Sequence, residues 1–166
     1  MILYTVLPLW MLIAVAQAPA PAPVMWRTVQ PGVTHATLRL PVASHLGDSR
    51  LHVVRVDPRR ARLRVGLAGL HSRRKRTLRW WLRRRQLSVA TNLGMFARNH
   101  RTHVGYTRVG KHVHNPRWRK DYLSAFAFDP RRKGLPAWVM VDLDRPGAKK
   151  RLAGYRVVIQ NLRLIK

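Results

Sequence analysis

The sequence contains no cysteine and no glutamate. The absence of cysteine excludes disulfide bonds, thiolate catalysis and zinc sites that use cysteine ligands. Acidic groups are scarce, because the 166-residue chain has only six of them, all aspartates, at positions 48, 57, 121, 129, 142 and 144. Lysine and arginine number 33, which gives a formal net charge of +27. This charge predicts attraction to polyanions such as nucleic acid, anionic lipid or phosphorylated glycans.

Several common catalytic signatures are also missing. The sequence has no Walker loop, no Gly-x-Ser-x-Gly nucleophile elbow and no dinucleotide-binding glycine motif. We also find no repeat of fixed period. Hydrophobic residues nevertheless make up 46% of the chain, which is enough for one folded domain with a core and excludes a disordered basic tail.

The N-terminus predicts export. Residues 2–15 are apolar and uncharged, and Ala14-Val15-Ala16 offers the small-x-small pattern of a signal-peptidase site. We therefore expect a signal peptide at 1–16, a Pro/Ala linker at 17–25 and a folded domain at 26–166, in a secreted or periplasmic protein. The alternative is that the apolar segment stays in place as an N-terminal membrane anchor.

Hydrophobic periodicity predicts an α+β fold, with a mixed β-sheet and few short helices. Alternating patterns predict strands at 33–40 and 63–67, and the segment 51–56, ended by Asp57-Pro58, is another predicted strand. The strands at 51–56 and 63–67 are close enough to form a hairpin around 58–60. Thr77 is placed to cap a helix at 78–86, and a short apolar run at 87–90 predicts another strand. This order of strand, strand, helix and strand is the basis for the α+β prediction. Further predicted elements are a hairpin of 103–109 with 111–114 across Gly110, strands at 122–128, 138–141 and 157–159, and a turn at Gln160-Asn161.

Three clusters are candidates for chemistry, and each has a plainer interpretation. Four histidines surround the Gly110 hairpin, at 100, 103, 112 and 114; they are zinc-ligand types, but no cysteine or glutamate accompanies them, and we expect solvent-facing residues and no metal site. Asp142 and Asp144 are spaced for acid–base work or Ca²⁺ binding, or are simply solvated. The basic run at 73–85 contains Trp80 and Trp81 and is suited to gripping phosphates and stacking bases; alternatively, it is a charged helix face with Trp81 in the core.

One motif carries a family resemblance. The segment Ser88-Val89-Ala90-Thr91-Asn92-Leu93-Gly94-Met95-Phe96 resembles the small-x-Asn-Gly-Gly-x-Phe motif of the phosphodiester glycosidase family. That family includes a lysosomal enzyme that removes N-acetylglucosamine from a phosphodiester, and bacterial exopolysaccharide-associated proteins. Asn92, Gly94 and Phe96 match the motif, whereas Leu93 stands where glycine is usual. Segments at 31–33, 51–58, 103–106 and 158–165 resemble other parts of the family in the same order.

The resemblance spans about residues 26–166 and covers the family's N-terminal half, so we expect an incomplete domain. It implies a substrate-binding site formed by Asn92, Gly94, Phe96 and Asn161 and shaped by Gly105. It does not assign a catalytic acid, a catalytic base or a cofactor. Arg98, Arg101 and Arg108 are candidates to hold a phosphate.

The predicted function is therefore a secreted phosphodiester glycosidase-like protein that hydrolyses or binds a sugar phosphodiester or related polysaccharide. The alternative is a non-catalytic exported basic module that binds anionic glycan or envelope lipid, since the charge also suits a membrane surface. Binding to a specific nucleic acid is the third and least favoured hypothesis, because export makes an intracellular target improbable and no nucleic-acid motif is present.

Overall fold

The computed structural model describes residues 23–72 and 74–164. The predicted signal peptide and most of the predicted linker lie outside these residues. None of the helices in the described ranges is both long enough and apolar enough to cross a membrane.

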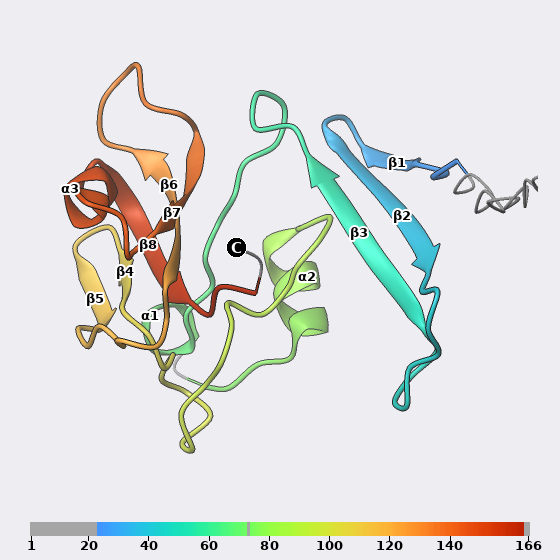
Figure 1. Ribbon diagram of the computed structural model, residues 1–166, viewed down its shortest axis with the longest axis horizontal. Helices are drawn as coiled ribbons and strands as arrows, with labels where there is room; N and C mark the ends of the chain where they lie inside the picture. The colour runs from blue at the N-terminus through green and yellow to red at the C-terminus, as the bar shows by residue number, and fades with distance from the viewer. Residues whose placement is uncertain (1–22, 73, 165–166) are drawn as a thin grey trace, which may run out of the picture.

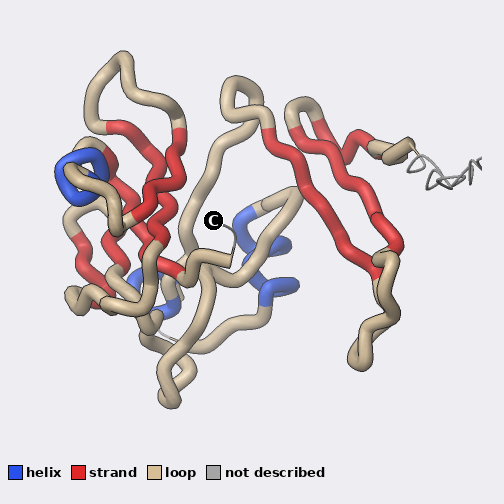
Figure 2. The backbone as a smooth tube through the Cα atoms, viewed as in Figure 1, coloured by secondary structure: helices blue, strands red, loops and turns tan. Residues whose placement is uncertain are grey.

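The strands form two separate antiparallel sheets (Figure 1). The first has three strands in chain order: β1 (Arg27–Gln30), β2 (Val33–Arg39) and β3 (Arg50–Val56). The second has five strands in the order β5-β4-β8-β6-β7: β4 (Thr107–Val109), β5 (His112–Asn115), β6 (Ser124–Pro130), β7 (Trp138–Asp142) and β8 (Tyr155–Asn161). The helices are short: α1 (Ala68–His71), α2 (Leu78–Arg85) and α3 (Ala148–Ala153). Figure 2 shows how little of the backbone is helical, with α2 between the two sheets.

The α+β prediction is wrong, because the fold is mainly β and every strand pair is antiparallel. The error comes from two predicted strands, 63–67 and 87–90, that do not form. Without them, the order of elements that suggested an α+β architecture is lost. The expected hairpin around 58–60 is absent as well, since β3 pairs along its whole length with β2.

Each of these two segments packs without a ladder partner. Val65 packs against the apolar cluster of Phe128, Val157 and Ile159. This packing accounts for an apolar residue at position 65 without a strand at 63–67. Leu87 ends α2, because its N–H donates to the Leu82 carbonyl while Gln86 adopts the left-handed conformation at the helix C-cap. An apolar run can be buried by loops as well as by strands.

Most other elements confirm the sequence prediction. Strands β2 and β3 match the predicted segments, and the Thr77 hydroxyl caps α2 by accepting a hydrogen bond from the Trp80 N–H. The hairpin across Gly110 is present as β4 and β5. The predicted turn at Gln160-Asn161 is wrong, because β8 continues through both residues and pairs them with Ala125 and Ser124 of β6.

The five-stranded sheet holds most of the core, with apolar side chains on both faces. Successive residues of a strand point to opposite faces. Ala125, Ala127 and Val158 lie on the face that packs against Leu152 of α3. Phe126, Phe128, Val157 and Ile159 lie on the opposite face, against Val65 and Leu93 from the connecting segments. By contrast, only Val33 and Ala36 are buried in the three-stranded sheet.

Gln160 is a fully buried polar residue in the middle of this core, with 1% of its surface exposed. Its Oε1 accepts hydrogen bonds from the Tyr106 N–H at 3.1 Å and the Arg119 N–H at 2.9 Å. Its Nε2 donates to the Arg119 carbonyl at 2.6 Å and the Tyr122 carbonyl at 2.7 Å. The amide therefore uses all its usual hydrogen-bonding positions on backbone, and it connects β8 to the segment before β4 and to the loop before β6.

Gln160→Leu tests this network. Leucine keeps a similar volume but leaves four buried backbone groups without a partner, so we expect a loss of about 4 kcal/mol in the free energy of unfolding. Urea unfolding followed by circular dichroism measures the loss. Gln30→Leu, at an exposed position of β1, is the control and should change stability by less than about 1 kcal/mol. Equal effects of the two substitutions would contradict the structural role of Gln160.

Candidate functional site

Gly94 and Asn161, two of the predicted site residues, are in direct contact. Asn161 Nδ2 donates a hydrogen bond to the Leu93 carbonyl at 3.0 Å. Gly94 has a φ of +134°, and a Cβ at this position would lie 2.5 Å from Asn161 Nδ2. Only glycine fits here, because both the backbone conformation and the space exclude a side chain. The motif segment is therefore held against the end of β8.

Gly105 lies on the other face of β8, against Gln160. A Cβ at Gly105 would lie 2.8 Å from the Gln160 carbonyl oxygen. Because Gln160 and Asn161 are adjacent in a strand, their side chains point to opposite faces of the sheet. Gly105 therefore shapes the Gln160 network, and the structure does not bring it together with Gly94 and Asn161 in one pocket.

The other two predicted site residues, Asn92 and Phe96, lie in different environments. Asn92 is exposed, and its Nδ2 donates to the Gly94 carbonyl at 3.2 Å, so it stabilises the turn of its own motif. Phe96 is 47% exposed and forms an isolated β-bridge with His103. Phe96 also lines a cavity, which makes it the predicted residue with the most direct access to a ligand.

This cavity, which we call the Phe96 cleft, has a volume of about 120 Å³. It collects residues from α1, from the segment leading into α2, from α2 itself and from the Gly110 hairpin. Its lining residues are Gly66, Leu67, Ala68, Lys75, Arg76, Trp81, Leu93, Phe96, His100, Arg101, His103, Thr107 and His114. Three of these are permanent cations, three are histidines and none is a carboxylate.

The expectation that the four histidines face solvent is wrong for His103, and both His103 and His114 make hydrogen bonds to backbone. His103 is 1% exposed. Its Nδ1 lies within hydrogen-bonding distance of the Gly105 N–H, the Gly105 carbonyl and the Thr107 hydroxyl, whereas its Nε2 is buried without a hydrogen-bond partner among the described residues. Burial lowers the pKa of His114 below its usual value of 6.5, more than the hydrogen bond to the Arg101 carbonyl raises it. His114 is thus uncharged at neutral pH and gains a positive charge on acidification. No group of three or more metal-ligand side chains is assembled within the described residues.

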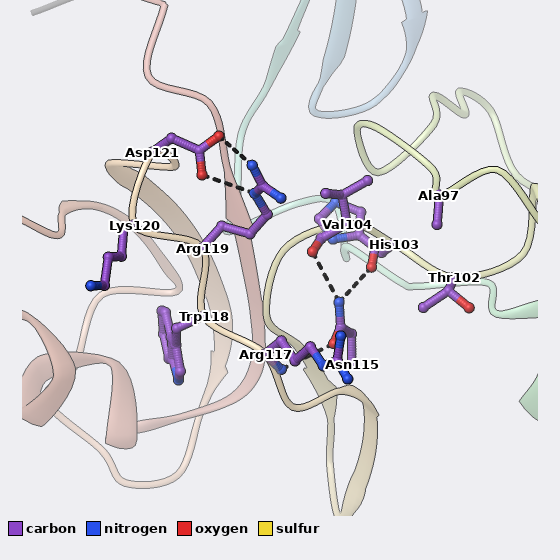
Figure 3. A pocket seen from close by; sticks show the side chains of 10 residues that line it. All are labelled: Ala97, Thr102, His103, Val104, Asn115, Arg117, Trp118, Arg119, Lys120 and Asp121. Carbon is purple, nitrogen blue, oxygen red and sulfur yellow. Dashed lines mark hydrogen bonds and ion pairs between the residues drawn. The ribbon is translucent and has the colours of Figure 1, made fainter.

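A second cavity, of about 600 Å³, shares His103 with the lining of the Phe96 cleft and is shown in Figure 3. We call it the Trp118 cavity; it is lined by Ala97, Thr102, His103, Val104, Asn115, Arg117, Trp118, Arg119, Lys120 and Asp121. Asn115 and Arg119 are already paired, whereas Arg117 and Lys120 form no ion pair among the described residues. Asn115 Nδ2 donates to the His103 and Val104 carbonyls, and the Arg119 guanidinium makes two hydrogen bonds to Asp121. The Trp118 ring stacks on Tyr106, with 4.3 Å between centroids.

Asp142 and Asp144 do not form a free carboxylate pair. Both contact the Arg163 guanidinium, which donates two hydrogen bonds to Asp144 at 3.0 Å and lies 3.5 Å from Asp142. These bonds lower the pKa of Asp144. The Arg163 guanidinium already contacts the carboxylate oxygens that would accept a proton from a substrate or bind a Ca²⁺ ion. The structure therefore supports neither the acid–base nor the calcium interpretation.

Sequence reasoning assigned no ligand contact to Leu93 or Thr107, and it named Lys75 and Arg76 only as part of the basic run at 73–85, without connecting that run to the motif at 88–96. These residues come from three separate segments of the chain, so only the tertiary structure groups them around one cleft. Arg101 was a phosphate candidate and does line the cleft. Arg108 does not, because its guanidinium donates to the Tyr155 carbonyl at 2.6 Å. Gln160 had a signal in the sequence, since it is a polar residue directly after the apolar run Val157-Val158-Ile159.

Comparisons with protein-family models, with curated proteins and with solved structures give no match to this chain. The resemblance carried by the motif at 88–96 therefore stays a prediction.

Gly94→Ala tests the contact between the motif and β8. We expect it to destabilise the fold by about 2 kcal/mol or more, because the new Cβ meets the Asn161 amide. The control Gly47→Ala also has a positive φ, of +87°, but its Cβ would meet no atom within 4 Å, so only backbone strain of about 1 kcal/mol is expected. In a double-mutant cycle by urea unfolding, Asn161→Ala should relieve part of the Gly94→Ala loss. Strictly additive losses would refute the contact.

The ion pair of Arg163 predicts a pH dependence. The folded-state pKa of Asp144 is lowered, so the stability that this pair contributes is fully present above the ordinary pKa of about 4 and is lost as the pH falls through the folded-state pKa. The stability difference between wild type and Arg163→Met should be constant from about pH 5 to 7 and shrink at lower pH. Urea unfolding across this range measures it, and a difference that grew on acidification would contradict the sign.

Proposed function

We propose that this protein binds a phosphate-bearing glycan, namely a sugar phosphodiester or a related anionic polysaccharide, through the Phe96 cleft. The observation that carries the proposal is the charge of the cleft lining, which contains Lys75, Arg76 and Arg101 and no carboxylate. Among the described residues, none of these three cations forms an ion pair with an aspartate. An anion that enters the cleft therefore meets unneutralised guanidinium and ammonium groups.

The small volume of the Phe96 cleft suits a phosphate group better than a whole sugar phosphodiester. At about 120 Å³, it is well below the roughly 300–1,000 Å³ of pockets that enclose a whole drug-sized ligand. The sugar would then lie at the mouth, where Phe96 is 47% exposed and offers an apolar surface. Phe96, the one predicted site residue in the cleft lining, and Arg101 both belong to the segment around the end of the motif.

We propose binding in preference to hydrolysis. Most glycosidases use two carboxylates on either side of the scissile bond. The lining of the Phe96 cleft contains none, and Asp142 and Asp144 are bound to Arg163. The signal-peptide-like N-terminus supports export as part of the proposal, since export would bring the protein to the glycans of the cell envelope or the exterior.

Arg101→Gln tests the site. We expect it to weaken binding of the methyl phosphodiester of N-acetylglucosamine 1-phosphate by about 10-fold, because a charge-assisted hydrogen bond is lost. Isothermal titration calorimetry measures the affinity, with N-acetylglucosamine as the uncharged control ligand. The matched control variant is Arg98→Gln, three residues away and outside the cleft lining, which should bind as wild type does.

Three results would overturn the proposal. Equal affinity for the charged and uncharged sugars would remove the role of the cations. Equal losses in the Arg98 and Arg101 variants would replace the cleft by a general charge effect. Release of free N-acetylglucosamine during the titration, abolished by Arg101→Gln, would show a hydrolase instead of a binding protein.

A further inference from the structure

The exposed side of α2 is a second cationic feature, separate from the Phe96 cleft. It is formed by Arg79, Trp80, Arg83 and Arg84, and we call it the α2 surface. In a helix, residues four apart are neighbours, so Arg79 lies beside Arg83 and Trp80 beside Arg84. The three arginines are exposed and Trp80 is half-buried. None of the four lines the Phe96 cleft.

The charge of the α2 surface is not balanced within the described part of the protein. No acidic residue occurs between Asp57 and Asp121. The ion pairs of the described residues involve Arg50, Arg119, Arg156 and Arg163, and none involves α2. Like charges four residues apart destabilise a helix, so the Arg79–Arg83 pair carries a cost that a polyanionic partner would relieve.

The two tryptophans of α2 have different environments. Trp81 is turned into the protein, where its ring covers Gly66 so closely that a Cβ there would lie 3.1 Å from it, and it meets His71 edge-on. Trp80 packs edge-on against Trp81, and the Arg76 guanidinium lies 4.7 Å from its ring centroid. Trp81 therefore lines the Phe96 cleft and is not part of the α2 surface, and the Arg76 guanidinium already lies over the Trp80 ring.

An anionic lipid surface fits these features better than nucleic acid. Tryptophan is enriched at the boundary between lipid headgroups and acyl chains, because its ring is apolar and its N–H is polar. Trp80 supplies this kind of side chain on the same side of α2 as the three arginines, and it is half-buried. Basic helices that also carry tryptophan lie in the interface plane of membranes that contain anionic lipids.

We propose that the α2 surface docks this protein on an anionic lipid bilayer, with Arg79, Arg83 and Arg84 on the lipid phosphates and Trp80 at the headgroup level. The three arginines do not line the Phe96 cleft, so their substitution tests docking separately from the proposed glycan, whereas Trp80 contacts two lining residues of the cleft, Arg76 and Trp81.

The experiment is sedimentation of the full chain with vesicles of phosphatidylcholine alone and with vesicles containing one quarter phosphatidylglycerol. The apolar sequence at 2–15 could insert into both, so the quantity of interest is the gain in affinity from phosphatidylglycerol. In the variant Arg79→Gln/Arg83→Gln/Arg84→Gln we expect this gain to fall by about 100-fold, since each cation near the surface contributes roughly a factor of five. Circular dichroism checks that the variant is folded.

The matched control removes the same number of charges elsewhere, in Arg132→Gln/Lys133→Gln/Lys150→Gln. These residues are exposed on the β6–β7 connection and on α3. At physiological salt, where screening acts over about 8 Å, this control should lose less than about 3-fold. Trp80→Ala, with all charges kept, should weaken binding by about 5-fold or more.

The proposal fails if phosphatidylglycerol gives wild type no gain, or if both triple variants lose affinity equally, which would indicate net charge alone. It also fails if Trp80→Ala binds as wild type does. Duplex DNA that displaces wild type from the vesicles at equal phosphate concentration, through the same three arginines, would replace lipid by nucleic acid as the partner.

Discussion

The hydrogen bonds of Gln160 are the interaction on which the rest of the five-stranded sheet depends. A buried amide without partners is costly, but one that satisfies four backbone groups is a strong geometric constraint. Here the amide joins β8 to Tyr106 and to the loop containing Arg119 and Tyr122. Gly105 leaves room for it. The walls of both cavities are anchored at this point, because the segment from His103 to Tyr122 contributes to each of them.

The distribution of acidic residues determines the electrostatics of the surface. Four of the six aspartates pair with arginines at or after Arg119, and Asp48 pairs with Arg50. Asp57 accepts a hydrogen bond from the Arg59 N–H in a turn. The long stretch between Asp57 and Asp121 therefore has cations but no acids of its own, and it supplies both the Phe96 cleft and α2. The glycan proposal and the membrane proposal both rest on this uneven distribution of acidic residues. In the first the cations line a small cleft, and in the second they lie on the exposed side of a helix.

The predictions that succeeded concern segments in which a longer apolar pattern or a capping residue marks the element. Apolar patterning over six or more residues placed β2 and β3, whereas the shorter alternating segment 63–67 forms no strand, and a threonine before an amphipathic segment marked the start of α2. Those that failed concern short apolar runs. Val65 and Leu87 are partly buried by packing and by helix capping, without a strand partner. Burial alone does not distinguish a strand from a packed loop, because the ladder hydrogen bonds depend on residues far away in the chain.

The sequence by itself determined the net charge, the absence of thiol chemistry, the strand alternation and the importance of Gly94, because these follow from composition and local spacing. Only the tertiary structure decided which residues meet. It placed Asn161 against Gly94 and Gly105 against Gln160, on opposite faces of one strand. It also bound Asp142 and Asp144 to Arg163 and grouped Lys75, Arg76 and Arg101 around one cleft. The physical reason is that contacts between distant segments depend on how sheets and loops pack, which local spacing does not encode.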